Sequence, residues 1–529
     1  MIRRDYHLLL LPLVSGIVMV FAYSPFSVPV LPFIGFVPLL IWLSRPLSVR
    51  EMTLGSLAFA VPYFCGNLYW LFVLGSFTHA GYAGAAGLIL MHLTTFFIFT
   101  ICLTALNRIR PLPLAVSAPV LWVVTEHPRN FGDFQFPWVT LGYSLGDWPR
   151  LAQHADLVGV YGLSFWLVLV NALAASLFLA RRKPRARLVY AAILAAALLV
   201  PAVYNPIRYR RIVREVDAAP RVEIAVVQPN VPQVAKWRPE TVDTIYDVIN
   251  RSVAEADARN VDLVAAPEAS LPLPLPVGAA RLPDEIRPGR IPLLIGGLIG
   301  IGEGDVRQVG SRTITVYQQH YNAAILATPD RSILAWRGKH YLVPVTEQFP
   351  YRKTLGFLLP LMTKQFGRFV PGDEPTPLEL ETARGRVPFA ALVCYESIFP
   401  ELPRSLRNQG ARFFVVVTND AWFGRTSFPY QHAAISAIRA IETRTPVVQA
   451  ANTGISFLYD AAGRSTHATR IFEKDLFTAS VPLAGEPTVY ARTGDLVLWL
   501  SYAAALVFLA LAWGAHRRGR AVGLRSRKV

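Results

Sequence analysis

The chain has 529 residues, of which 53% are hydrophobic and only 16% are charged, whereas soluble domains carry about 25% charged residues. This composition excludes an ordinary soluble protein and a disordered one. The formal net charge of +17 is unevenly distributed: residues 1–218 carry 17 Lys and Arg against 8 Asp and Glu, residues 496–529 carry 6 against none, and residues 219–495 carry 29 against 27. Because the basic excess lies among apolar segments, where it sets membrane orientation, nucleic-acid binding is excluded.

Apolar segments fill the first 218 residues. Seven of them are long enough, or nearly so, to cross a hydrocarbon layer of ~30 Å, which takes about 20 helical residues, and an eighth lies near the C-terminal end. The spans are expected near 7–24, 28–44, 52–74, 84–106, 111–126, 156–180, 188–204 and 496–515. The first also resembles a signal peptide with Ala22-Tyr23-Ser24 as its cleavage site, but a second span follows almost at once, which favours an uncleaved anchor.

The basic residues of the short loops predict the orientation. With the N-terminus in the cytoplasm, most of them fall on the cytoplasmic side, whereas loop 75–83 has no Lys or Arg and loop 127–155 has two. The cytoplasmic set is Arg3, Arg4, Arg45, Arg50, Arg108, Arg110, Arg181, Arg182, Lys183, Arg185, Arg187 and the tail from Arg517 to Lys528. Seven crossings then deliver residues 205–495 to the outer face. Four arginines fall on that face against the rule, which weakens ahead of a large translocated domain: Arg208, Arg210, Arg211 and Arg214.

The chain is therefore predicted to have three parts: an N-terminal membrane domain (1–218), an extracytoplasmic domain (219–490), and a last span with a basic tail (491–529). In the middle part, short apolar runs bounded by Pro, Gly, Asn and Asp indicate buried strands, and apolar residues at three- and four-residue spacing indicate helices, so we expect an α/β domain. Strands are expected at 222–228, 263–267, 291–299, 322–327, 333–337, 387–394, 413–418, 447–451 and 455–460, and helices at 239–258 and 428–443. The apolar stretch 351–373, which no predicted strand follows, is either a loop that touches lipid or an ordinary core helix.

Cys394 is the single cysteine of the predicted extracytoplasmic part, since Cys65 and Cys102 lie in predicted spans. A lone thiol cannot form a structural disulfide within the domain, and it is too little for a typical zinc site. A buried inert cysteine is one interpretation. The other is a nucleophile, because Cys394 stands at the C-terminal end of a predicted strand, where open α/β sheets place their reacting groups.

A nucleophilic thiol needs a base, because its usual pKa of ~8.5 leaves little thiolate at neutral pH. Two further strand ends offer partners: Glu268 follows the strand at 263–267, and Lys339 follows the strand at 333–337. A carboxylate can take the thiol proton, and an ammonium can stabilise a thiolate and a tetrahedral oxyanion. Exposed surface Glu and Lys residues are far commoner than catalytic ones, so this neighbourhood alone would not single them out.

At these residues the chain resembles the nitrilase, or carbon–nitrogen hydrolase, superfamily, whose members use a Glu–Lys–Cys triad in this chain order. With eight spans around the domain, it is similar to the apolipoprotein N-acyltransferase family over nearly its whole length. The matching motifs are Gln228-Pro-Asn-Val-Pro-Gln233 with Lys236-Trp237, Pro267-Glu268, Lys339-x-x-Leu-Val-Pro344-x-x-Glu347, Cys394-Tyr395-Glu396, Asn419-Asp-Ala-Trp-Phe-Gly424, Gln431-His432, Asn452-Thr-Gly-Ile-Ser456, Glu126-x-x-Arg129 and Phe136-Pro-Trp138. The chain departs from the family at Val345-Thr346, where Phe-Gly is usual, and at Gln449, where Arg is common.

The resemblance implies a helical membrane bundle plus an α-β-β-α sandwich, in the bacterial inner membrane with the catalytic domain on the periplasmic side. It implies that Cys394 takes an acyl chain from a phospholipid, most simply phosphatidylethanolamine, with Glu268 as base and Lys339 holding the oxyanion. The acyl group then passes to the α-amine of a diacylglyceryl-cysteine at an apolipoprotein N-terminus. A monomer is expected, and neither a metal nor a nucleotide is needed.

Four further residues match positions that the family uses around its site: Trp237, Glu347, Tyr395 and Glu396. Glu347 is expected to orient the lysine or fix its loop, and Glu396 to do the same beside the thiol. Trp237 is otherwise an ordinary packed aromatic. His432 is expected to be a structural histidine, and Glu126 with Arg129 an internal ion pair.

Two alternatives stay open at this point. A membrane-tethered nitrilase-type amidase would share the triad and pass the acyl group to water, but a soluble amidase needs no eight-span anchor. A transporter or scaffold with an inactive soluble domain would still work after Cys394→Ala.

Overall fold

A computed structural model describes residues 9–77, 79–109, 112–236, 238–309, 312–355 and 369–525 of the chain. It divides into two compact units. The first comprises Met1–Tyr69, Ala86–Ile207 and Thr493–Val529, and the second comprises Trp70–Ala85 and Arg208–Arg492.

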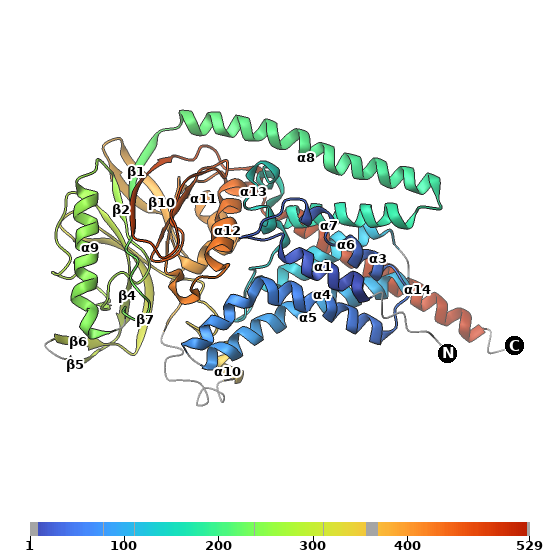
Figure 1. Ribbon diagram of the computed structural model, residues 1–529, viewed down its shortest axis with the longest axis horizontal. Coiled ribbons are helices and arrows are strands. Elements are labelled where there is room, and N and C mark those ends of the chain that lie inside the picture. Colours follow the sequence, from blue (N-terminus) through green and yellow to red (C-terminus); the bar gives the residue numbers. More distant parts are fainter. Residues whose placement is uncertain are drawn as a thin grey trace. The chain divides into compact units, whose positions relative to one another are not determined.

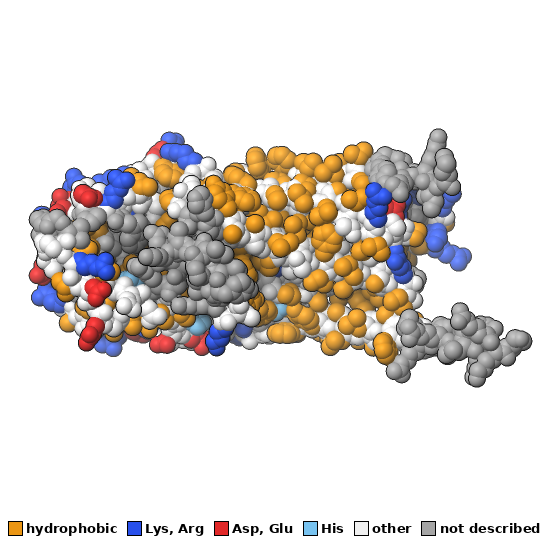
Figure 2. Space-filling view, turned by 90° about the horizontal axis from the view of Figure 1, so that it is seen from below, with side chains coloured by type: hydrophobic (Ala, Val, Ile, Leu, Met, Phe, Trp, Pro, Cys, Tyr) orange, Lys and Arg blue, Asp and Glu red, His pale blue; other side chains and the backbone are white. Residues whose placement is uncertain are grey.

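Apolar helices make up the first unit (Figure 1). In the described part of the chain, five helical segments are long and apolar enough to cross a membrane: Val49–Ser76, Gly81–Ile109, Ala155–Leu179, Pro184–Ala218 and Leu496–Ala515. They correspond to helix α4 (Val49–Leu68) with its 3₁₀ extension η2 (Tyr69–Ser76), α5 (His79–Ile109), α7 (Ala155–Leu179), α8 (Pro184–Ala218) and α14 (Leu496–Arg525). Figure 2 shows hydrophobic side chains spread over the exposed surface of these helices, as a lipid environment requires. The chain is thus a membrane protein in its N-terminal part.

The other three predicted spans form shorter helices. Stretch 7–24 contains α1 (Leu10–Val20), stretch 28–44 is divided into α2 (Leu31–Ile34) and α3 (Val37–Leu43), and stretch 111–126 contains α6 (Leu114–Glu126). At 1.5 Å per residue none of these reaches the ~30 Å of a hydrocarbon core as one helix. The number of eight spans therefore stays a prediction.

Polar side chains fix the helix ends and loops of this unit. Ser48 caps α4: its hydroxyl accepts from the Glu51 N–H, and the Glu51 carboxylate accepts from the Ser48 N–H at 2.8 Å. Buried Glu126 accepts from the backbone N–H of Leu141 at 2.8 Å, and buried Arg129 donates to the Thr95 hydroxyl at 3.0 Å. These contacts hold the loop after α6 against the helices.

The second unit is a four-layer α-β-β-α sandwich, as the family resemblance implied (Figure 1). Its first sheet has the order β15-β1-β2-β4-β7-β8, with β3 beside β4, and its second has the order β14-β13-β12-β11-β10-β9. The first sheet consists of β1 (Arg221–Gln228), β2 (Leu263–Ala265), β3 (Leu275–Pro276), β4 (Leu293–Ile301), β7 (Gln319–Ala327), β8 (Ile333–Gly338) and β15 (Asp475–Pro482). The second consists of β9 (Leu378–Thr382), β10 (Gly385–Val393), β11 (Phe414–Thr418), β12 (Val447–Ala451), β13 (Phe457–Tyr459) and β14 (Ser465–Ala468).

Helices cover the outer face of each sheet. Helix α9 (Val242–Asp257) packs its apolar face, including Tyr246 and Ile249, on the first sheet. Helices α11 (Glu401–Asn408) and α12 (Phe428–Thr443) cover the second sheet, where Leu406 and Ala440 join its core. The inner faces meet where β1 contacts β12 and β7 contacts β10. Burial on both faces explains the uninterrupted apolar runs that predicted these strands.

All nine predicted strands and both predicted helices of this domain are confirmed, with ends that differ by a few residues. Four elements were missed in the main sheets, namely β3, β9, β14 and β15, together with a separate hairpin of β5 (Asp305–Val309) and β6 (Arg312–Val316). Within 351–373, α10 (Arg352–Leu355) is a short helix, and 356–368 lie outside the described residues. The prediction for that stretch is therefore untested.

The segment Trp70–Ala85 belongs to the second unit although it includes most of η2 and the start of α5. The Trp70 indole donates to the side-chain oxygen of Gln431 at 3.1 Å, and its ring packs edge-on against Phe423 and Phe428. These contacts anchor the segment on the start of α12 and the loop before it.

Candidate active site

Three strand ends bring the predicted triad together. Glu268 follows β2, Lys339 follows β8, and Cys394 begins the 3₁₀ helix η8 (Cys394–Ile398) directly after β10. The first two strands belong to one sheet and β10 to the other, so the site lies where the two sheets face each other. All three side chains are buried. A cluster of ionisable side chains between two packed sheets is shielded from bulk water, and this strengthens the electrostatic interactions within it.

Lys339 stands between two carboxylates. Its Nζ lies 2.9 Å from Oε1 of Glu347 and 3.6 Å from Oε1 of Glu268. Burial alone would lower the pKa of Lys339, but the charges of Glu347 and Glu268 outweigh it and raise that pKa. The lysine is therefore an ammonium at every physiological pH.

Asn322 and Asn419 fix the Glu268 carboxylate. The side-chain amide of Asn322, on β7, donates to Oε1 of Glu268 at 2.6 Å and to Oε1 of Glu347 at 2.9 Å. The backbone N–H of Asn419 donates to Oε2 of Glu268 at 2.8 Å. Both oxygens of Glu268 are thus held, and the two carboxylates share one amide and one ammonium.

Cys394 has a backbone conformation that non-glycine residues rarely adopt, with φ of 52°. This left-handed geometry costs about 1–3 kcal/mol, and it turns the chain sharply at the end of β10. Burial, and next the Glu268 charge, raise the pKa of the Cys394 thiol, while the Lys339 charge and a hydrogen bond with Thr418 act in the opposite direction. Because the net effect is upward, the resting sulfur is a thiol that needs a base when it attacks.

Two more predicted carboxylates tie the surrounding loops. Glu347 accepts from Lys339 with Oε1 and from the backbone N–H of Val343 with Oε2, at 2.8 Å. Glu396 accepts from the N–H of His340 at 2.6 Å and from the N–H of Val393 at 2.7 Å. Burial raises the pKa of Glu396, and these backbone hydrogen bonds oppose that rise. Glu396 therefore links the residue after Lys339 with the residue before Cys394.

Three predicted residues remain: Tyr395, Trp237 and His432. Tyr395 is buried, and its ring packs edge-on against Phe399 at 5.1 Å. Burial, and next the charges of Glu347 and Cys394, raise its pKa. Trp237 lies outside the described residues. Buried His432 is close to the Ser397 hydroxyl at 2.8 Å and to the Asp420 carboxylate at 3.5 Å, as expected for a structural histidine.

Sequence reasoning missed the residues that position the triad. Asn322 directly precedes the apolar run of β7 and is buried with it, and a lone Asn at the start of a buried run was the available signal. Lys236 was noted only as part of a motif, yet its buried Nζ donates to the backbone carbonyl of Glu268 at 3.1 Å. Burial lowers the pKa of Lys236 to about 7, although the Glu268 charge works against this shift.

The fold and the cluster together define the class of protein: an α-β-β-α sandwich with Glu, Lys and Cys side chains gathered at strand ends is the arrangement expected for carbon–nitrogen hydrolases. Residues 292–486 match the family model of the carbon-nitrogen hydrolases, and residues 15–173 match that of the apolipoprotein N-acyltransferase N-terminal domain.

Relatives extend this match to the whole chain. The apolipoprotein N-acyltransferase of Geobacter metallireducens is 32% identical over 97% of this chain and 96% of its own, and that of Bradyrhizobium diazoefficiens is 30% identical over 96% of this chain and 95% of its own. This chain belongs to the apolipoprotein N-acyltransferase family. Among solved structures, an amidase from Nesterenkonia sp. is 21% identical, with a TM-score of 0.35, over 54% of this chain and 98% of its own.

Proposed function

We propose that this protein transfers a fatty acyl chain from a membrane phospholipid, through a thioester on Cys394, to the α-amine of the N-terminal diacylglyceryl-cysteine of apolipoproteins. Membership of the family supports the reaction class. The observation that carries the mechanism is the buried contact of Lys339 with Glu268 and Glu347, beside the strand end that bears Cys394.

In the first half-reaction Glu268 takes the thiol proton as the Cys394 sulfur attacks the ester carbonyl of the phospholipid. The negative charge that develops on the carbonyl oxygen is stabilised by the Lys339 ammonium. When the intermediate collapses, the ester C–O bond breaks, and Glu268 returns its proton to the departing lysophospholipid oxygen. Phosphatidylethanolamine is the proposed donor.

In the second half-reaction the free α-amine of the apolipoprotein attacks the thioester. Glu268 accepts a proton from the attacking nitrogen, the C–S bond breaks, and the proton passes to the Cys394 sulfur. Both substrates are anchored in one leaflet, so the membrane itself supplies part of the orientation that a soluble enzyme obtains by binding.

Glu347, Glu396, Tyr395 and Trp237 have supporting roles in this proposal. Glu347 holds the lysine in place and fixes its loop through the Val343 N–H, which the contacts at 2.9 and 2.8 Å support. Glu396 fixes the positions of His340, next to the lysine, and Val393, next to the thiol, through their backbone N–H groups. For Tyr395 and Trp237 we propose a role in binding the substrate.

For the topology we propose eight spans, in which the short helices complete the five long ones, and a monomer in the bacterial inner membrane. Domain 219–490 then lies on the periplasmic side between membrane domain 1–218 and segment 491–529. The distribution of Lys and Arg among the short loops supports this orientation.

The acceptor is tested with the purified full-length protein in vesicles of phosphatidylethanolamine and a synthetic diacylglyceryl-cysteinyl peptide. The peptide is expected to gain one acyl chain for every lysophospholipid formed. A Cys394→Ala variant should yield neither product, whereas a Cys65→Ala/Cys102→Ala variant, changed at the other two cysteines, should yield both. Lysophospholipid with free fatty acid and an unmodified peptide would instead support the hydrolase alternative.

A further inference from the structure

Four buried polar side chains form a continuous series of contacts that begins and ends at Cys394: Thr418, Asp420, His432 and Ser397. Each of them is at most 1% exposed. Thr418 ends β11, Asp420 begins the 3₁₀ helix η9 (Asp420–Phe423), His432 lies in α12, and Ser397 lies in η8. Polar groups are costly to bury, whereas apolar side chains would fill the same space without that cost. Their convergence on one residue therefore indicates a role beyond packing.

Thr418 reaches the sulfur of Cys394. Strands β10 and β11 are parallel with Val393 opposite Val417, so Thr418 lies beside Cys394 at the ends of the two strands. The Thr418 hydroxyl forms a hydrogen bond with the Cys394 thiol, and it donates to Oδ1 of Asp420 at 2.7 Å. Because the carboxylate fixes the hydroxyl, the hydroxyl in turn limits the directions that the sulfur can take.

Ser397 reaches the backbone carbonyl of Cys394. Its hydroxyl donates to that carbonyl at 3.0 Å and lies 2.8 Å from Nε2 of His432. Nδ1 of His432 lies 3.5 Å from the same Oδ1 of Asp420 that accepts from Thr418, which closes the ring of contacts. A left-handed backbone such as that of Cys394 persists only where its surroundings over-determine it, and this ring holds the residue at its sulfur and at its carbonyl.

The turn after β11 also holds the base. Asn419, which stands between Thr418 and Asp420, donates its backbone N–H to Oε2 of Glu268 at 2.8 Å. Three consecutive residues therefore fix the nucleophile and its base at the same time, and a displacement of this turn would move both.

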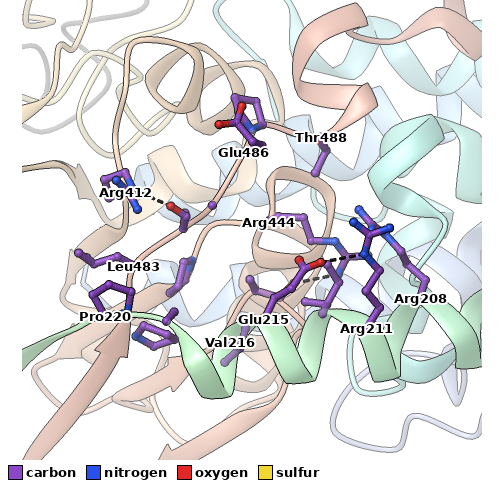
Figure 3. A pocket seen from close by; sticks show the side chains of 18 residues that line it. Arg208, Arg211, Glu215, Val216, Pro220, Arg412, Arg444, Leu483, Glu486 and Thr488 are labelled. Carbon is purple, nitrogen blue, oxygen red and sulfur yellow. Dashed lines mark hydrogen bonds and ion pairs between the residues drawn. The ribbon is translucent and has the colours of Figure 1, made fainter.

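The network is separate from the cavity of about 450 Å³ that Figure 3 shows. Arg412, in the chain before β11, and Pro446, in the chain before β12, line that cavity, whereas none of the four network side chains does. Since β10, β11 and β12 are parallel, the cavity lies at their amino ends and the network at their carboxyl ends. The network therefore serves Cys394 and not this cavity.

We propose that this network positions Cys394 for attack, with Thr418 orienting its sulfur and Ser397 its backbone carbonyl. This role rests on the proposed acyl transfer and deepens it. Glu268 and Lys339 remain the groups that move the proton and hold the oxyanion, and the network supplies the geometry in which they act.

His432 links Ser397 to Asp420 and is not a base for the reaction. Asp420, His432 and Ser397 are arranged in the order of a serine-hydrolase triad. The Ser397 hydroxyl, however, is buried and donates to a backbone carbonyl, and Nε2 of His432 faces that hydroxyl. The three side chains are therefore positioning residues.

The hydroxyl of Thr418 is tested in the full-length protein in detergent, with Cys65→Ala/Cys102→Ala present throughout so that Cys394 is the only thiol. Thr418→Val removes the hydroxyl and keeps the shape of the side chain, whereas Thr418→Ser keeps the hydroxyl. Thr443→Val is the matched control, since buried Thr443 donates to the carbonyl of Arg439 at 2.7 Å and takes no part in the network.

The first measurement is the rate at which each variant gains acyl mass from phospholipid. Thr418→Val should lower the maximal rate by about tenfold or more, because a hydrogen bond to a charged group is lost. The phospholipid concentration for half-maximal rate should stay within about twofold, since the network does not bind the phospholipid. Thr418→Ser and the control should keep the reference rate within about threefold.

The second measurement is the pH profile of iodoacetamide alkylation, which a purely structural role would not move. Burial, and next the charges of Glu268 and Asp420, raise the pKa of the Cys394 thiol, whereas the Lys339 charge and the Thr418 hydrogen bond lower it. Thr418→Val should therefore shift the profile to higher pH, and Thr418→Ser should not. Alkylation needs no phospholipid, so a protein that is alkylated but gains no acyl mass would count against the proposed function alone.

Ser397→Ala keeps the proposal testable if Thr418→Val fails to fold. It should lower the maximal rate by about 2- to 12-fold, the range of one neutral hydrogen bond. Ser252→Ala is its matched control and should not, since Ser252 is a buried serine of α9 whose hydroxyl donates to the Val248 carbonyl at 2.9 Å. Reference rates in both Thr418→Val and Ser397→Ala would overturn the proposal. So would equal losses in Thr418→Val and Thr418→Ser, or a shift of the Thr418→Val alkylation profile to lower pH.

Discussion

Asn322 offers the most informative perturbation of the site, because its single amide group donates to both Glu268 and Glu347. Asn322→Ala removes both hydrogen bonds and leaves two buried carboxylates to share only Lys339. A hydrogen bond to a charged group contributes about 1.5–3 kcal/mol. If the bond to Glu268, at 2.6 Å, is needed to hold the base in place, its loss should slow thioester formation by about 10- to 150-fold, since about 1.4 kcal/mol is a factor of ten.

The assay is the rate at which the protein gains acyl mass after mixing with phospholipid, followed by quenched intact-mass spectrometry. Because Asn322 acts through Glu268, the maximal rate should fall while the phospholipid concentration for half-maximal rate stays within about twofold. Asn250→Ala is the control, since Asn250 is a half-buried residue on α9 that donates to the Glu285 carbonyl at 2.7 Å and has no contact with the triad among the described hydrogen bonds. A wild-type rate for Asn322→Ala would refute the assigned role, and so would a change confined to the half-maximal concentration.

Three further predictions concern the same cluster. Because the Glu268 charge raises the pKa of the Cys394 thiol, Glu268→Gln should shift the pH profile of iodoacetamide alkylation at Cys394 to lower pH, and a shift to higher pH would contradict the described electrostatics. Gly296→Ala should reduce the rate of acyl transfer by at least about tenfold, because a Cβ at this position lies 2.4 Å from Cα of Glu268. Gly485→Ala should leave the rate unchanged, because its Cβ meets nothing within 4 Å. Equal activities of the two variants would show that the backbone at Glu268 can shift without loss of function. The pKa of Lys236 falls to about 7 on folding, so between that pH and ~10.5 the unfolded chain binds more protons than the folded chain. Thermal unfolding should therefore show the wild type gaining stability relative to Lys236→Met as the pH rises through this window. A stability difference that stays constant with pH would contradict this prediction.

The strands of the catalytic domain could be predicted because both faces of each sheet are covered. Runs such as Phe414–Thr418 are buried at every position and so read as uninterrupted apolar segments. The strands that were missed are more exposed: in β9, Leu378 and Leu380 are buried while Glu379 is exposed, β14 is exposed at every position, and β15 pairs with β1 across eight positions despite a weak pattern. The partner of β15 is distant in sequence, so a local pattern carries little information about that pairing, whereas β9 and β14 pair with their chain neighbours β10 and β13.

The candidate triad could be proposed because each member lies at the end of a predicted strand or within two residues after it, and the carboxyl ends of neighbouring strands meet. What the sequence did not reveal was the set of groups that hold the triad. Asn322 reaches Glu268 and Glu347 only because β7 pairs with β4 and β8 in one particular register. The Asn419 N–H reaches Glu268 across the two sheets, which is a consequence of sheet packing that no spacing in the sequence encodes.

The central claim is that Cys394 carries an acyl thioester, and the intact mass of the protein purified from membranes tests it most directly. The wild type and the Cys65→Ala/Cys102→Ala variant are expected to show a fatty-acyl adduct that neutral hydroxylamine removes, and Cys394→Ala is expected to lack it. An adduct that persists in Cys394→Ala would contradict the account. So would a wild-type Cys394 that stays unmodified after incubation with phospholipid vesicles.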